Sequence, residues 1–183
     1  MIEISYDHNM LERVEKKLGK MKSEAPKALK NAINQTARQA RIELKNQVRK
    51  QYTVKAGKVS QAMRIQRATN ARLDATIFVK GKTLNITNYK TTAPKKGAKA
   101  QIVKDGGLKQ IVGPKGITAF KGINDLLWQR RGKERYPIKP LKSLSIPKAV
   151  GSEKRVYGVV KPHIKDNLKK NVNAQVRKVL QGR

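Results

Sequence analysis

The side chains that most often carry catalysis or bind metals are sparse in this chain. It has no cysteine, which excludes thiolate zinc sites, cysteine nucleophiles and disulfides. The only two histidines, His8 and His163, lie near opposite ends of the chain, a spacing that does not favour a metal site or histidine-based acid–base catalysis. The 12 carboxylates are isolated and form no cluster that would hold a divalent metal for nuclease chemistry. We therefore expect no enzyme activity, no metal site and no cofactor.

Positive charge is the chemistry that the chain has in excess. It has 43 Lys and Arg against 12 Asp and Glu, a formal net charge of +31. Residues 1–43 carry a net +3, so residues 44–183 carry a net +28. Such an excess favours contact with a polyanion, meaning nucleic acid, an acidic partner protein or an anionic membrane. The simpler alternative is that many of these lysines are only solvated.

Lysine dominates the cations, and lysine suits contacts with backbone phosphates better than bidentate reading of bases. If the chain meets DNA, we expect binding without sequence preference and with strong salt dependence.

The most cationic local pattern is a predicted β-hairpin over residues 126–147. An apolar strand carrying the only tryptophan, Trp128, leads into a tip, residues 130–135, that has four cations against one carboxylate. Gly132 is the natural apex, because glycine adopts positive φ at little cost. The return segment contains Pro140 and ends at Pro147, which predicts an edge strand because proline lacks a donor N–H. We expect Trp128 to pack in the core and the tip to face a negative partner or water.

A second cationic segment, residues 88–101, lacks periodicity and carries four lysines, so we predict a mobile basic loop. The candidate contacts with DNA or a partner are therefore the tip residues Arg130, Arg131, Lys133 and Arg135 and the loop residues Lys90, Lys95, Lys96 and Lys99.

Two helices and a sheet are expected to position these segments. Apolar or small residues recur at a period near 3.6 and predict a long helix over about 25–50: Leu29, Ile33, Ala37, Ala40, Leu44 and Val48. Residues 2–6 and 63–86 alternate and predict a short strand and an antiparallel meander whose third strand begins at Leu84. A closing helix over 161–182 is predicted to open at Pro162 and to carry one apolar stripe: Ile164, Leu168, Val172, Val176, Val179 and Leu180. The fold class is α+β, in a single domain over 1–183.

The N-terminal residues and the hydropathy of the chain give one further expectation. Residues 1–7 lack the basic and apolar regions of a signal peptide, and no apolar stretch reaches the roughly 20 residues that span a bilayer. We expect a soluble protein that is made in a cytoplasm and does not enter a membrane.

The hairpin also carries a resemblance. Its segment resembles the signature of the minor tail protein Z family of tailed bacteriophages and prophages, through residues spread over the tip, the return and the following turn: Arg130, Gly132, Lys133, Arg135, Pro137, Ile138, Leu141, Ser145, Ile146 and Pro147. Residues 28–37 are similar to the long helix of the family with its Asn-x-Thr step, and residues 51–56 to the turn that follows. The likeness extends over roughly residues 25–180. Ser143-Leu144 departs from it, because the family often has Gly-Pro there, and loop 88–101 looks like a local elaboration.

The resemblance implies a structural virion protein, assembled in the host cytoplasm, that acts in tail completion at the head-proximal end of the tail. Related proteins form rings, often of six copies, around the DNA channel. The implied partners are other copies of the chain, the tail tube or terminator, and neck proteins. From the charge we add nonspecific contact with the phage DNA, since a basic ring around a channel would explain the excess after residue 43.

Two other functions stay open on the residues alone. A cytoplasmic nucleic-acid-binding protein of ribosomal or nucleoid type would share the charge but would not associate with virions. A nuclease or toxin would require metal-dependent cleavage, which the missing carboxylate cluster disfavours.

Overall fold

The computed structural model describes residues 1–6, 8–113 and 116–182 and has an α+β fold, which confirms the predicted class. The chain divides into two compact units, one of residues 1–44, 63–79 and 157–183 and the other of residues 45–62 and 80–156. The expectation of a single domain over 1–183 stays a prediction, because a division by packing does not establish how the units fold. In the described part of the chain, no helix is both long and apolar enough to cross a membrane.

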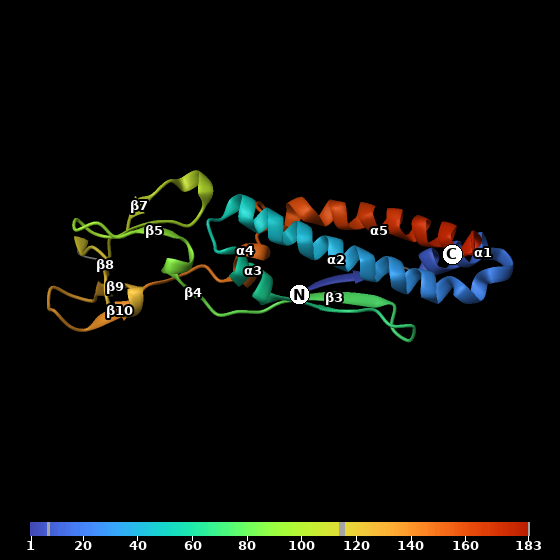
Figure 1. Ribbon diagram of the computed structural model, residues 1–183, viewed down its shortest axis with the longest axis horizontal. Coiled ribbons are helices and arrows are strands. Elements are labelled where there is room, and N and C mark those ends of the chain that lie inside the picture. Colours follow the sequence, from blue (N-terminus) through green and yellow to red (C-terminus); the bar gives the residue numbers. More distant parts are fainter. Residues whose placement is uncertain (7, 114–115, 183) are drawn as a thin grey trace. The chain divides into compact units, whose positions relative to one another are not determined.

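The first unit is built around residues 25–44 of α2, Ala25–Gln51, and the last turns of this helix belong to the second unit. Helix α2 confirms the long helix predicted from its period. Helix α5, Tyr157–Leu180, runs antiparallel beside it (Figure 1). Several of the buried positions of α2 are alanines, which lets neighbouring elements approach its backbone closely: Ala28, Ala32, Ala37 and Ala40. A shorter helix, α1, His8–Leu18, also packs against α5 and is followed by a 3-10 helix over Gly19–Glu24.

Polar side chains fix the register between α2 and α5. The buried Asn171 Nδ2 donates to Thr36 Oγ1 at 2.9 Å and to Gln39 Oε1 at 2.8 Å. One turn earlier on α5, Asn167 Nδ2 donates to Glu43 Oε1 at 2.8 Å. Buried polar groups cost free energy unless paired, so these bonds favour one alignment of the two helices over a slipped one.

The sheet of the first unit has the strand order β1-β3-β2, with β1 at Ile2–Ser5, β3 at Asp74–Val79 and β2 at Met63–Gln66. Both pairings are antiparallel, and Ile77 lies opposite Ile2 on one side and Ile65 on the other. The meander prediction was right for β2 and β3 but wrong for its third strand. Strand β4, Leu84–Asn85, pairs instead with β11, Lys142–Ser143, in the second unit. The free edge of β3 is taken by β1, whose Ile2 and Ile4 are buried.

The closing helix begins earlier than predicted. It starts at Tyr157 rather than at 161, and Pro162 lies inside it. A proline in the second turn removes only one backbone hydrogen bond, and the buried Val160 extends the apolar stripe one turn ahead of Ile164. Leu168, Val172 and Val176 continue the buried stripe as the periodicity predicted, whereas Leu180 is exposed.

Besides the β4–β11 pair, the described residues of the second unit form two three-stranded antiparallel sheets. One has the order β5-β6-β7, with β5 at Lys90–Thr92, β6 at Lys99–Gln101 and β7 at Lys109–Gln110. The other has the order β10-β9-β8, with β8 at Phe120–Lys121, β9 at Leu127–Arg130 and β10 at Ile138–Pro140. Two short helices, α3 at Ala56–Ala62 and α4 at Ile146–Val150, pack together in the same unit.

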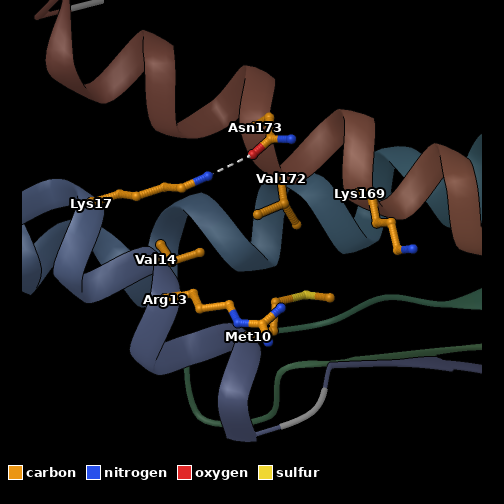
Figure 2. A pocket seen from close by; sticks show the side chains of 7 residues that line it. All are labelled: Met10, Arg13, Val14, Lys17, Lys169, Val172 and Asn173. Atoms are coloured by element: carbon orange, nitrogen blue, oxygen red, sulfur yellow. Dashed lines mark hydrogen bonds between the residues drawn. The ribbon is translucent and has the colours of Figure 1, made fainter.

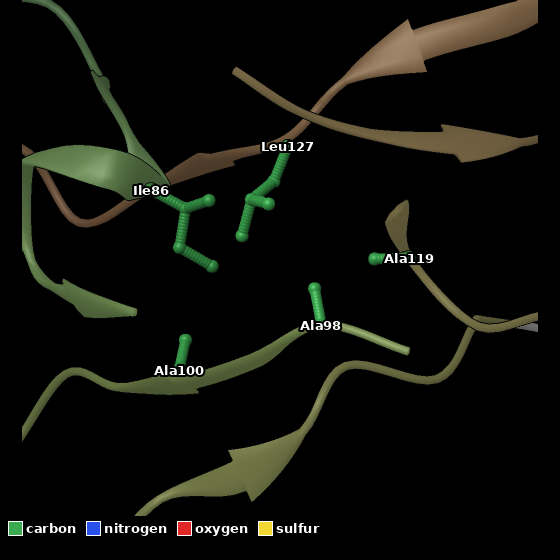
Figure 3. Packing of buried hydrophobic residues seen from close by; sticks show 5 residues of the cluster. All are labelled: Ile86, Ala98, Ala100, Ala119 and Leu127. Carbon is green, nitrogen blue, oxygen red and sulfur yellow. The ribbon is translucent and has the colours of Figure 1, made fainter. Parts of the chain in front are cut away.

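A compact apolar cluster holds the strands of the second unit together. Figure 3 shows Ile86 and Leu127 facing Ala98 and Ala100, with Ala119 at the side. Ile102, Ile111 and Leu141 pack around this cluster and are partly buried. The cluster is small because three of its five members are alanines, so hydrogen bonds must supply much of the specificity of this unit.

Candidate nucleic-acid interface

The hairpin predicted over residues 126–147 is present. Strands β9 and β10 pair antiparallel, with Arg130 opposite Ile138 and Trp128 opposite Pro140. β10 is an edge strand of its sheet, as the prolines predicted, because Pro140 has no N–H to donate to a further strand. The hairpin tip, residues 130–135, begins at the last paired residue of β9, and residues 131–135 lie beyond the paired strands.

Trp128 is not the core residue that its large aromatic side chain predicted. Leu127 and Gln129 face inward on β9, so the alternation of the strand places Trp128 on the opposite face, where it is only partly buried. Its Nε1 donates to the carbonyl of Ile123 at 3.2 Å. The indole lies against Gly122, where a Cβ would come within 2.7 Å of Trp128 Cδ1.

Gln129 is a structural residue that sequence reasoning missed. It is 4% exposed, and its Nε2 donates to the carbonyl of Ile117 at 3.0 Å. Gly113 leaves room for this side chain, since a Cβ there would lie 2.5 Å from Gln129 Nε2. The signal in the sequence was that Gln129 lies two residues after Leu127 and therefore on the same face of the strand. It was missed because Gln129 is polar.

Residues 88–101 were predicted to be a loop, but they contain the β5–β6 hairpin. We name this hairpin, residues 90–101, the lysine hairpin. Ala98 and Ala100 are buried and Lys99 between them is exposed, so the segment does alternate. The alternation escaped notice because its inward residues are alanines rather than large apolar side chains. Gly97, at φ +114°, closes the turn against Thr118, where a Cβ would meet Thr118 Cβ at 2.9 Å.

Thr53 joins both strands of the lysine hairpin. Its hydroxyl accepts from the N–H of Lys90 at 3.1 Å and donates to the carbonyl of Gln101. Its own N–H donates to the carbonyl of Ile102 at 3.0 Å. The turn at 51–56 therefore serves to anchor this hairpin.

All eight candidate cations are exposed. Arg130 lies over the ring of Phe120 at 5.4 Å and Arg135 over that of Tyr136 at 5.8 Å, geometries that hold a guanidinium while leaving its N–H groups in water. Lys90 and Lys99 extend from β5 and β6, and Lys95 and Lys96 lie in the turn between them. Within the described residues, none of the eight belongs to a recorded ion pair.

The structure brings the turns of the two cationic hairpins to one end of the second unit. The turn of the lysine hairpin and the hairpin tip both lie at the end away from α3 and α4 (Figure 1). This unit has 24 Lys and Arg against 4 Asp and Glu, a net charge of +20. Two of its carboxylates form ion pairs with cations outside the two hairpins. Asp125 pairs with Lys121 at 2.8 Å, a hydrogen bond and charge that lower the pKa of Asp125, and Asp105 pairs with Arg155 at 3.1 Å.

Comparison with models of known protein families identifies the family of the chain. The family model described as prophage minor tail protein Z matches residues 10–182. The chain belongs to the minor tail protein Z family. No curated protein and no solved structure matches it. Membership in the minor tail protein Z family indicates a structural protein of the bacteriophage tail.

Much of the minor tail protein Z signature serves packing. Ser145 caps α4, accepting from the N–H of Lys148 at 3.4 Å, while Pro147 lies in the first turn and Ile146 is 2% exposed. Leu141 donates its N–H to the carbonyl of Leu127 at 2.8 Å. The charged residues of the signature remain exposed at the tip, and among the residues that the structure describes their side chains form no ion pair: Arg130, Lys133 and Arg135.

The Asn-x-Thr step of α2 is structural as well. Asn34 Nδ2 donates to the carbonyl of Ala68 at 3.0 Å, and the N–H of Ala68 donates back to Asn34 Oδ1 at 2.9 Å. Thr36 donates to the carbonyl of Ala32 and accepts from Asn171. Asn34 therefore fixes the connection between β2 and β3, and Thr36 fixes α5, both in the first unit.

Proposed function

We propose that this tail protein acts in tail completion at the head-proximal end of the tail, as a ring of copies around the DNA channel that aids head–tail joining. Its role is structural and non-enzymatic. Its partners are other copies of itself, the tail tube or terminator, and neck proteins. The hairpin tip and the lysine hairpin contact the phage DNA through its phosphates.

The observation that carries this proposal is the set of eight exposed cations on the hairpin tip and the lysine hairpin, two segments whose turns lie at one end of the second unit. In the described structure none of the eight has an acidic partner. Cations that are not neutralised within the chain remain available to an external anion. Phosphate contacts do not read bases, which suits a channel through which every sequence of the genome must pass. In a ring, each copy repeats the same contacts.

The test is a tip variant in which Arg130, Arg131, Lys133 and Arg135 are all replaced by glutamine. Its matched control replaces Lys20, Lys22, Lys165 and Lys170, four exposed lysines of the first unit, and so loses the same charge. We expect both variants to keep nearly the melting temperature of the wild type, because exposed substitutions change stability little. The loss of the Arg130–Phe120 contact costs about 0.5–1 kcal/mol in the tip variant.

Two readouts separate the possible results. For duplex DNA, the slope of log affinity against log salt should fall by about 3 to 4 in the tip variant, since each phosphate contact contributes about 0.9. Complementation of a phage lacking the gene should yield unjoined heads and tails with the tip variant and infectious particles with the control. Normal infectivity of the tip variant would remove the tip from the mechanism. DNA binding by a protein absent from purified particles would favour a cytoplasmic nucleic-acid-binding protein instead.

A further inference from the structure

A groove between α1 and α5 in the first unit is not used by the proposed DNA contact. It consists of two hollows, of about 290 and 380 Å³, that share Lys17 and Asn173. The first is lined by Met10, Arg13, Val14, Lys17, Lys169, Val172 and Asn173 (Figure 2). The second adds Val176, Arg177 and Leu180. Named here the α1–α5 groove, it follows α5 from Lys169 to Leu180, about 17 Å at 1.5 Å per residue.

The groove combines an apolar floor with a cationic rim. Val14 and Val172 point into the first hollow from opposite helices (Figure 2), and Val176 continues this floor into the second. Four cations stand along the rim: Arg13, Lys17, Lys169 and Arg177. None of the described residues that line either hollow is a carboxylate.

One hydrogen bond divides the groove. Lys17 Nζ donates to Asn173 Oδ1 at 3.1 Å, and it reaches from α1 across to α5 (Figure 2). Both side chains are exposed, so the ammonium can exchange this amide oxygen for a stronger, charged acceptor. A carboxylate placed between the two hollows would be such an acceptor.

We propose that the α1–α5 groove binds an acidic amphipathic segment of a partner protein, with apolar side chains on the floor and carboxylates against the rim. The charge pattern decides between occupants. A second copy of this chain is disfavoured because the chain carries +31 and only 12 carboxylates. Duplex DNA is disfavoured because its outer surface is the charged phosphate backbone, which offers no apolar side chains to fill the floor. The length of the groove fits a helix or strand of a partner, the usual helix-in-groove arrangement.

The probe is a fluorescein-labelled peptide of about 12 residues that repeats Leu-Leu-Glu-Glu, a length that matches the groove as a helix. Its controls are the same peptide with glutamine in place of glutamate, and polyglutamate without leucine. The groove variant replaces Arg13, Lys17 and Lys169 by glutamine. The matched variant replaces Lys16 of α1, Lys20 of the 3-10 helix that follows α1, and Lys170 of α5, which are exposed and line neither hollow.

We expect the Leu-Leu-Glu-Glu peptide to bind the full chain more tightly than either control peptide. The groove variant should weaken that binding by roughly tenfold or more, and the matched variant by about twofold or less, because rim charges act mainly at short range. Leu180→Gln should weaken binding without any change in charge. Circular dichroism melting of each variant shows that the fold is kept.

Several results would overturn the proposal. Equal losses in the groove and matched variants would mean attraction to net charge alone. Equal binding of the glutamine peptide would remove the role of the rim. Binding of phosphatidylglycerol vesicles or of duplex DNA that requires Arg13, Lys17 and Lys169, without binding of the peptide, would assign the groove to a lipid or nucleic acid. None of these readouts depends on the hairpin tip, so the proposed DNA contact can fail separately.

Discussion

At the scale of single residues, the second unit depends on glycines that make room for polar and aromatic side chains. Gly113 faces the buried Gln129 and Gly122 faces Trp128. In a core that is mostly alanine, a methyl group added to one of these glycines displaces a side chain that is held in place by a hydrogen bond. Such a side chain cannot move aside as freely as a flexible one.

Gly113→Ala should therefore destabilise the protein by about 1–3 kcal/mol, because the new Cβ would push Gln129 off the carbonyl of Ile117. Gly57→Ala is the matched control. Gly57 lies within α3 with nothing within 4 Å of an added Cβ, so alanine there should be neutral or stabilise by up to about 1 kcal/mol. Urea unfolding measures both. Equal stability of the two variants would show that the Gly113–Gln129 contact is not tight.

Tyr89 predicts a dependence of stability on alkaline pH. Burial, aided by the nearby Tyr52, raises the pKa of Tyr89 from 10.0 to about 12, and its hydroxyl donates to the carbonyl of Leu144 at 2.6 Å. Between these values the unfolded chain loses the phenol proton and the folded chain keeps it. The contribution of Tyr89 is thus fully present below pH 10 and is lost as the pH rises toward 12.

The stability difference between wild type and Tyr89→Phe should shrink by up to about 2–3 kcal/mol over that range, since one pKa unit is worth about 1.4 kcal/mol. The comparison cancels the titration of the many lysines, which both proteins share. Tyr136→Phe, at a residue that is 64% exposed, should show no such change. A wild type and a Tyr89→Phe variant that lose stability in parallel would contradict the buried phenol.

Residue environments were the part of the fold least accessible from the sequence. Trp128 was expected in the core because it is large and aromatic, but its strand buries Leu127 and Gln129 instead. Which face of a short strand is buried depends on what packs against it, and Ile86 and Ala98 come from elsewhere in the chain. The exposure of the cations was predictable, because long charged side chains are rarely buried without a partner.

At the scale of elements, the anchoring of the lysine hairpin by Thr53 is the most local test. Thr53→Val keeps the shape of the side chain but leaves the N–H of Lys90 and the carbonyl of Gln101 without this partner. It should cost about 1–3 kcal/mol, whereas Thr53→Ser, which keeps the hydroxyl, should cost less. Amide hydrogen exchange should show faster exchange over 90–101 in Thr53→Val alone. Unchanged protection there would remove Thr53 as an anchor.

Elements could be predicted where they are long and their apolar residues are large. Helix α2 and the stripe of α5 repeat apolar residues over several turns, so their period identified them. The lysine hairpin was missed because alanine and threonine carry its alternation. The pairing of β4 with β11 could not be derived, since it joins segments more than 50 residues apart by only two residues on each side.

At the scale of the whole molecule, positive charge is concentrated rather than uniform. The first unit has a net charge of +11 and the second +20. The first unit presents cations beside apolar side chains in the α1–α5 groove, which suits an acidic protein segment. The second presents exposed cations on the hairpin tip and the lysine hairpin, which suits phosphates. The two surfaces therefore favour different partners within one tail assembly.

The most direct test of the proposed function is a cryo-EM map of intact particles at the junction of head and tail. We predict a ring of copies of this chain at the head-proximal end of the tail, with the hairpin tip and the lysine hairpin facing the DNA channel. A map in which the chain occupies another part of the tail, or in which Arg130, Arg131, Lys133 and Arg135 face away from the channel, would contradict it.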